Sequence, residues 1–115
     1  MKIAIKGHAS RGKEVIQILE SLGGKNVSGL IGVYETFYYI NNKNEICDDH
    51  KKYFPSTYKF YTLEEFETIF PFKIGDEVIT TLGHIGKIIN IKDNKYEVFF
   101  KINSILISPK RLKLY

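Results

Sequence analysis

The chain has 115 residues, 43% of them hydrophobic, and includes eight Tyr and eight Phe. That is enough apolar surface for one domain or for two very small ones. The single cysteine, Cys47, excludes an intrachain disulfide and is typical of a reducing compartment, so we expect a cytoplasmic protein. No apolar run approaches the roughly 20 residues of a membrane-spanning helix, and no signal peptide is visible, so we expect no membrane partner.

The formal net charge of +4 is unevenly distributed. Residues 1–70 carry nine Lys/Arg and nine Asp/Glu, whereas residues 71–115 carry eight Lys/Arg and four Asp/Glu. A basic C-terminal third is compatible with a polyanionic partner, because Lys and Arg that neutralise phosphates release counterions. A net charge of this size is equally ordinary for a soluble protein without such a partner.

The N-terminal part predicts a strand followed by a helix. Residues 2–6 form a short apolar strand that ends at Gly7. Ser10 is the predicted N-cap of the helix, because its hydroxyl could accept a backbone N–H of the first turn. Apolar residues then recur at helical spacing until Gly23 and Gly24 end the helix.

A hairpin, a loop, a strand and a second helix follow. Residues 36–47 predict the hairpin, and the polar residues 48–57 predict a loop. Residues 58–61 form the next strand. Thr62 and Glu65 have the spacing of a capping box, which begins a short helix that Pro71 ends.

From Phe72 onward the pattern is entirely β. Five short segments are separated by tight turns, at residues 74–79, 86–91, 95–100, 105–107 and 112–114. Closure of such strands into a barrel removes exposed strand edges. We therefore predict an α+β fold, with an N-terminal α/β sandwich over residues 1–70 as the ligand-binding half and a five-stranded barrel over residues 71–115.

Four segments of the C-terminal part carry a resemblance to a known family: Gly75–Val78, Gly83–Ile88, Tyr96–Val98 and Pro109–Leu112. Their spacing resembles that of KOW/Tudor-like small barrels. Such barrels bind RNA, DNA or peptides, or only pack, so the resemblance implies a KOW-like fold and no particular ligand.

A second resemblance spans most of residues 1–75. Five segments carry it: Ile5–His8, Arg11–Ile16, Leu22–Asn26, Tyr38–Asn41 and Thr62–Phe66. They resemble a group of small proteins from bacteriophages and gut bacteria that has no established activity. The resemblance implies a phage-type origin, and hence the cytoplasm of a host cell as the location.

The turn between the first strand and the first helix is the leading candidate site. A helix N-terminus presents free N–H groups and the positive end of the helix dipole, so it attracts anions. Arg11 could add a bidentate contact to a phosphate and Lys13 a point charge, beside the backbone amide at Gly12. His8 and Ser10 could contribute further hydrogen bonds.

The spacing of Gly7, Gly12 and Lys13 is similar to that of a P-loop, but Glu14 stands where Ser or Thr would bind magnesium. This argues against NTP hydrolysis and leaves phosphate binding open. The competing interpretation is a solvated basic first turn capped by Ser10.

An aromatic strand contains Phe37, Tyr38 and Tyr39, of which Phe37 and Tyr39 should face one side and Tyr38 the other. Core packing is one interpretation. The other is that Tyr38 or Tyr39 contacts the ribose or base of a ligand bound at the strand–helix turn.

Cys47, Asp48, Asp49 and His50 include metal-binding residue types, but four adjacent residues do not converge on one ion. We therefore predict neither a metal site nor a cofactor.

Basic residues of the C-terminal part provide an alternative site. They are predicted to form a stripe that binds nucleic acid, with a turn histidine beside it: Lys87, Lys110, Arg111, Lys113 and His84. The competing interpretation is a solvated surface.

No nucleophile, base and orienting group assemble in the sequence, so we expect a binding protein rather than an enzyme. The leading hypothesis is a phage-type protein that captures a phosphate-bearing nucleotide and sequesters a nucleotide signal of host immunity. A homo-oligomer would help to enclose the ligand. The alternatives are a nucleic-acid-binding module, a protein–protein adaptor, and an enzyme acting on a phosphate ester with His8 as acid or base.

Overall fold

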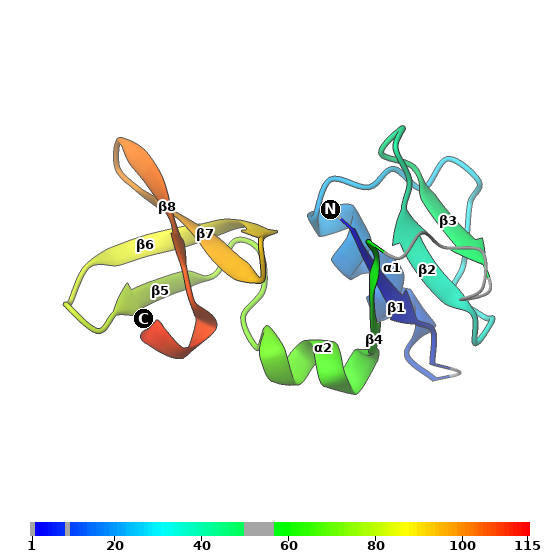
Figure 1. Cartoon of the computed structure of the whole chain (residues 1–115), viewed down its shortest axis with the longest axis horizontal. Coiled ribbons are helices and arrows are strands. Elements are labelled where there is room, and N and C mark those ends of the chain that lie inside the picture. The colour runs from blue at the N-terminus through cyan, green and yellow to red at the C-terminus, as the bar shows by residue number, and fades with distance from the viewer. Residues whose placement is uncertain (1, 9, 50–56) are drawn as a thin grey trace. The chain divides into compact units, whose positions relative to one another are not determined.

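The computed structural model describes residues 2–8, 10–49 and 57–115 of the chain (Figure 1). It divides into two compact units, Met1–Thr68 and Ile69–Tyr115. Two α-helices accompany a four-stranded and a five-stranded sheet, which confirms the mixed α+β class. None of the helices in the described part is both long enough and apolar enough to cross a bilayer.

The N-terminal unit contains a four-stranded sheet with the order β3-β2-β1-β4. Its strands are β1 (Ile3–Lys6), β2 (Phe37–Ile40), β3 (Ile46–Asp49) and β4 (Lys59–Thr62). β1 pairs antiparallel with β2 and parallel with β4, and β2 and β3 form the predicted hairpin. The predicted chain order of strand, helix, hairpin, strand and helix is the one observed.

Helix α1 (Gly12–Ser21) covers one face of this sheet (Figure 1). The register places Ile5 beside Tyr38, so that both side chains lie on the same face. The core between this face and α1 consists of buried apolar side chains: Ile3, Ile5, Val15, Ile16, Leu19, Tyr38, Ile40 and Ile46.

The opposite face of the sheet is aromatic. Ala4 is the register partner of both Tyr39 on β2 and Phe60 on β4, and it is fully buried. Because the alanine side chain is small, the rings of Phe37 and Phe60 meet edge to face with their centroids 5.2 Å apart.

The start of α1 differs from the prediction. Ser10 is not the N-cap: Arg11 holds that position, without a side-chain capping bond, and the Ser10 hydroxyl is bonded to His8 instead. The chain is close-packed here, since a Cβ added to Gly12 would overlap the carbonyl group of Gly32. Contact between these two glycine backbones therefore helps to define where the helix begins.

Helix α2 (Leu63–Ile69) begins with the predicted capping box. The Glu65 amide donates to Thr62 Oγ1 at 3.1 Å, and the Thr62 amide donates to Glu65 Oε1 at 3.0 Å. The bond from the Thr62 backbone lowers the pKa of Glu65 below its ordinary value. This reciprocal pair satisfies two backbone donors that the first turn would otherwise leave free.

Asp48 and Asp49 correct the prediction of a loop that begins at residue 48. Both belong to β3, paired with Tyr38 and Phe37 of β2. The predicted loop over residues 50–56 lies outside the described residues.

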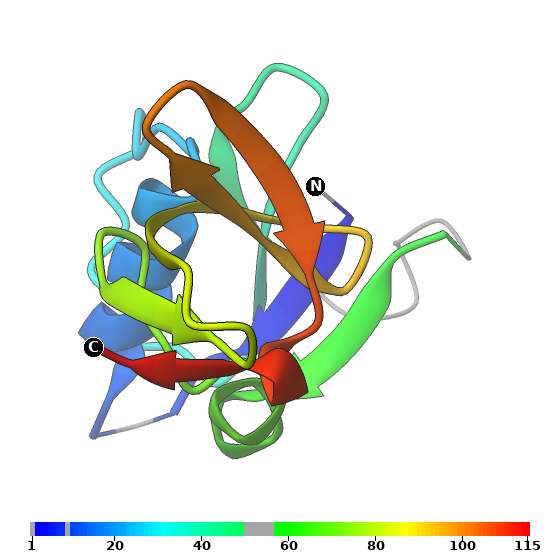
Figure 2. The same cartoon turned by 90° about the vertical axis from the view of Figure 1, so that its left-hand side faces the viewer.

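The C-terminal unit contains the five predicted strands in one antiparallel sheet of order β8-β7-β6-β5-β9. Figure 2 turns this unit toward the viewer. The strands are β5 (Glu77–Thr80), β6 (Ile85–Lys92), β7 (Lys95–Phe100), β8 (Asn103–Ile107) and β9 (Leu112–Leu114), with a 3₁₀ turn η2 (Pro109–Arg111) before β9. The predicted closed barrel is wrong, because the sheet is open and β8 and β9 form its two edges.

The core of this unit lies on one face of the open sheet. Its fully or almost fully buried side chains are Val78, Ile88, Ile91, Tyr96, Val98 and Leu112. A bulge between Ile88 and Asn90 shifts the register of β6 against β7. Such a bulge increases the bend of a strand, which lets a short sheet curl around its core.

Candidate ligand-binding site

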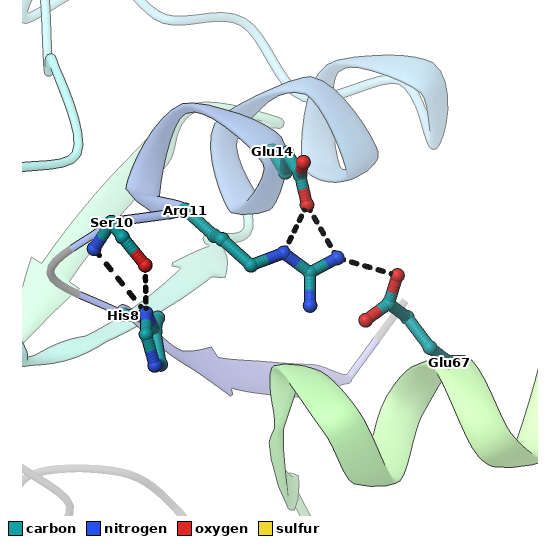
Figure 3. A network of polar contacts seen from close by, with 5 residues as sticks. All are labelled: His8, Ser10, Arg11, Glu14 and Glu67. Carbon is teal, nitrogen blue, oxygen red and sulfur yellow. Dashed lines mark hydrogen bonds and ion pairs between the residues drawn. The ribbon is translucent and has the colours of Figure 1, made fainter.

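The strand–helix turn of the N-terminal unit brings the predicted polar residues together (Figure 3). His8 Nδ1 lies 2.9 Å from Ser10 Oγ and 3.3 Å from the Ser10 amide nitrogen. Lys13 is exposed on the first turn of α1, and Gly12 is buried against Gly32. His8 and Ser10 therefore bond to each other, and the backbone at Gly12 is covered.

Arg11 is engaged by two carboxylates. Its Nε donates to Glu14 Oε2 at 2.7 Å, and its Nη2 donates to Glu67 Oε2 of α2 at 2.7 Å (Figure 3). The hydrogen bond that Arg11 donates to Glu67, and then the one that it donates to Glu14, raises the pKa of Arg11 above its ordinary value. The three side chains together carry a net negative formal charge, so this turn offers little attraction for a phosphate.

The two tyrosines lie on opposite faces of the sheet, as alternation predicts. Tyr38 is fully buried, and its hydroxyl donates to the Tyr34 carbonyl at 3.1 Å. Its ring is therefore enclosed by the protein. Tyr39 is half-buried on the face away from α1, with its ring centroid 5.6 Å from that of Tyr58. Neither ring lies on the α1 side of the sheet in a position exposed to a ligand.

No cluster of three metal-binding side chains occurs among residues 2–8, 10–49 and 57–115. Cys47 is half-buried, and burial raises the pKa of its thiol. The thiol is 3.3 Å from the Asn41 side-chain nitrogen. His50 lies outside the described residues.

The predicted basic stripe of the C-terminal unit divides into separate groups. Lys87 and Lys113 lie on the face of the sheet opposite the core, where Glu77 is the direct partner of Lys87. Lys110 is exposed on η2. His84 and Arg111, by contrast, lie together in the lining of a pocket.

The pocket has a volume of about 350 Å³, within the range of small-molecule sites. Most of its wall is apolar, and none of its lining residues is acidic. The lining consists of Thr80, Leu82, His84, Phe100, Asn103, Ile105, Leu106, Ile107 and Arg111. A guanidinium and an imidazole on a mostly apolar wall suit an anionic ligand that also has a flat or apolar part.

A tight turn positions His84. The Gly83 amide donates to the Thr80 carbonyl at 2.9 Å, and the Thr80 amide donates to the His84 carbonyl at 2.9 Å. Gly83 has a φ of +87°, a conformation that glycine adopts without steric cost. The His84 amide also donates to Thr80 Oγ1 at 3.1 Å. These bonds hold the backbone of His84 beside the end of β5.

Arg111 reaches the same place from the other end of the unit. Its carbonyl accepts a hydrogen bond from the Thr81 amide at 3.2 Å, which joins η2 to the β5–β6 turn. Within the described part of the chain, no carboxylate forms an ion pair with Arg111. The guanidinium is therefore available to an anion, unlike that of Arg11.

Sequence analysis found His84 and Arg111 but missed the apolar walls and the polar residues Thr80 and Asn103. No local signal marks these residues, because the pocket forms where the β5–β6 turn, β8 and η2 meet in space. Comparison of the chain with protein-family models, with curated proteins and with solved structures finds no match.

Proposed function

We propose that the chain is a non-enzymatic binding protein that captures a phosphate-bearing nucleotide in the pocket of its C-terminal unit. Arg111 and His84 hold the phosphate, and the apolar walls accept the base. The observation that carries this proposal is the presence of both residues in the lining of one pocket of about 350 Å³ that has no acidic lining residue.

The ligand then binds in the C-terminal unit and not at the strand–helix turn of the N-terminal unit. At that turn Arg11 is bonded to Glu14 and Glu67, and an incoming phosphate would have to displace two carboxylates from one guanidinium. A charge-assisted hydrogen bond between Arg111 and a phosphate needs no such displacement.

The strand order supports a KOW-like identity for the C-terminal unit, since the last strand, β9, pairs with the first strand, β5.

If the resemblance of the N-terminal part to phage proteins holds, the role is to sequester a nucleotide signal of host immunity in the host cytoplasm. Capture without turnover is sufficient for that role.

A thermal-shift and calorimetric titration with mononucleotides, cyclic oligonucleotides and ADP-ribose derivatives tests the proposal. A ligand at 100 times its dissociation constant should stabilise the fold by about 2.7 kcal/mol. Arg111→Ala should weaken binding by about 10- to 100-fold, since a hydrogen bond to a charged group contributes roughly 1.5–3 kcal/mol. Recovery of the ligand chemically unchanged would exclude the enzyme alternative.

Two matched variants locate the site. Lys113→Ala removes a cation from the other face of the same sheet and should leave binding unchanged. Arg11→Ala removes the arginine of the strand–helix turn and should also leave it unchanged. Loss of binding in Arg11→Ala but not in Arg111→Ala would return the ligand to the N-terminal unit. Absence of binding by every nucleotide would refute the proposal.

A protein–protein adaptor is the second candidate, because the sheet exposes large apolar side chains on the face opposite its core. Ile85 is 47% exposed, Ile89 43% and Phe99 42%, and Lys87 lies beside Phe99. Isolated apolar residues are normal on a surface, but a group of them is typical of a docking site. This candidate predicts no response to nucleotides, and capture of a host protein that Phe99→Asp abolishes.

A further inference from the structure

Strand β8 forms one edge of the five-stranded sheet, and within the described part of the chain it pairs with β7 alone. An antiparallel partner uses the N–H and C=O groups of alternate residues, so every second residue of β8 directs these groups away from β7. The register against β7 is regular over all five residues, Asn103–Ile107, without a bulge. The free side of β8 is therefore a regular template to which another strand can add.

β8 lacks the features that keep the edges of natural sheets from pairing, which include charged side chains, short strands and bulges. Among the four sheet edges of the described residues it is the longest, and it alone contains no charged residue. The other edge of the same sheet, β9, has three residues with Lys113 at its centre. In the N-terminal unit, β3 contains Asp48 and Asp49, and β4 begins with Lys59. β8 is therefore the edge best suited to pairing.

The side chains of β8 are exposed on both faces of the sheet. Ile105 is 51% exposed and Leu106 is 36% exposed, and consecutive residues of a strand point to opposite faces. Asn103 and Ser104 are exposed as well. A strand added at this edge would therefore cover apolar surface on both faces while it completes the main-chain hydrogen bonds.

We infer that β8 pairs antiparallel with β8 of a second copy of the chain, about a twofold axis at Ile105. In this register Ile105 lies opposite Ile105 of the second copy, and Ser104 lies opposite its Leu106. An identical partner brings like charges together wherever the strand is charged, and like charges directly opposite each other are destabilising. β8 is the edge that escapes this repulsion, and it offers a charged peptide no ion pair. The same patch on both copies then forms a closed twofold interface.

The pairing also adds to the half-open pocket of the C-terminal unit. Four of the five residues of β8 line this pocket: Asn103, Ile105, Leu106 and Ile107. Direct partners across a ladder project from the same face, so Ile105 and Ile107 of the second copy extend the apolar wall. This consequence rests on the proposed function, whereas the pairing of β8 does not.

Sedimentation velocity of the full chain without nucleotide, over a range of protein concentrations, tests the inference. We expect an equilibrium that shifts from monomer to dimer as the concentration rises. Ile105→Lys places two like charges opposite each other at the axis and should leave only the monomer. Leu114→Lys is the matched control, because it adds the same charge to the edge strand β9 at a side chain that is 62% exposed. It should keep the dimer.

Amide hydrogen exchange of the wild-type chain is a second measurement, which depends on the folding of no variant. Exchange in β8 should slow as the protein concentration rises, and exchange in β9 should stay the same. A monomer at every concentration, or a dimer that Ile105→Lys leaves intact, would overturn the inference. Because no nucleotide is present, either result leaves the proposed function standing, and the nucleotide titration tests that function separately.

Discussion

The hydroxyl of Tyr96 bonds to both backbone groups of Phe72, donating to its carbonyl oxygen and accepting from its amide, each at 2.8 Å. The same ring packs against Phe70 and Phe72, with centroids 5.6 and 5.8 Å away. Tyr96 is fully buried, so water does not replace these bonds. One side chain on β7 thus holds the segment that precedes β5.

Tyr96→Phe should destabilise the C-terminal unit by about 1–3 kcal/mol, because it leaves the carbonyl and the amide of Phe72 without a partner. Urea unfolding followed by circular dichroism measures the loss. Tyr115→Phe is the control, since Tyr115 is 70% exposed, and its stability should equal that of the wild type. Equal stability of Tyr96→Phe and wild type would show that the two bonds contribute nothing.

Stability should fall as the pH rises above about 10, the ordinary pKa of tyrosine. Burial raises the pKa of Tyr96 well above that value, so the folded chain keeps the phenol proton while the unfolded chain loses it. The unfolded state then binds fewer protons, and the free energy of unfolding decreases with pH. Urea unfolding at about pH 9 and about pH 11 should show a steeper decrease for wild type than for Tyr96→Phe.

Gly32→Ala should destabilise the N-terminal unit by more than Gly29→Ala. Both glycines have positive φ, +75° and +65°, so both alanines are strained at the backbone. Only at position 32 would the new methyl group also overlap the backbone of Gly12, whereas nothing lies within 4 Å at position 29. We expect about 1 kcal/mol for Gly29→Ala and about 2–4 kcal/mol for Gly32→Ala by urea unfolding. Equal losses would mean that the Gly12–Gly32 contact is dispensable.

Thr62→Ala should destabilise α2 by about 0.5–2 kcal/mol, the usual cost of removing an N-cap side chain. Thr62→Ser keeps a hydroxyl for the Glu65 amide and should retain most of the stability.

The fold lowers the pKa of Glu65, so the ionised Glu65 carboxylate stabilises the folded state at a pH above its ordinary pKa. This stabilisation is lost as the pH falls below that value. Amide hydrogen exchange in α2 measures both effects, and unchanged exchange in Thr62→Ala would contradict the capping role.

Local signals in the sequence predicted the elements well. The capping box of Thr62 and Glu65 depends on residues three positions apart, and the alternation of Phe37, Tyr38 and Tyr39 depends on the pleat alone. Strand β7 occupies the predicted residues, 95–100, because its alternation is regular and a turn precedes it.

Relationships between distant segments could not be predicted. Arg11 bonds to Glu67, which is 56 residues away, and this contact occupies the guanidinium that the sequence assigns to a phosphate. Ser10 has the right chemistry for an N-cap, but its hydroxyl bonds to His8. Arg111 and His84 were assigned to a stripe with three lysines, and only the register of the sheet separates the two groups.

The pairing of β1 with its two neighbours has a consequence for the order of folding during synthesis. β1 is an inner strand, yet its parallel partner β4 ends at residue 62. The four-stranded sheet therefore cannot be completed until residue 62 has left the ribosome. Strands β5, β6 and β7 each pair with the next strand along the chain, and such local pairing is fast. The N-terminal unit therefore depends on contacts between residues far apart in the sequence. One edge of its first strand, β1, stays unpaired until β4 has been synthesised.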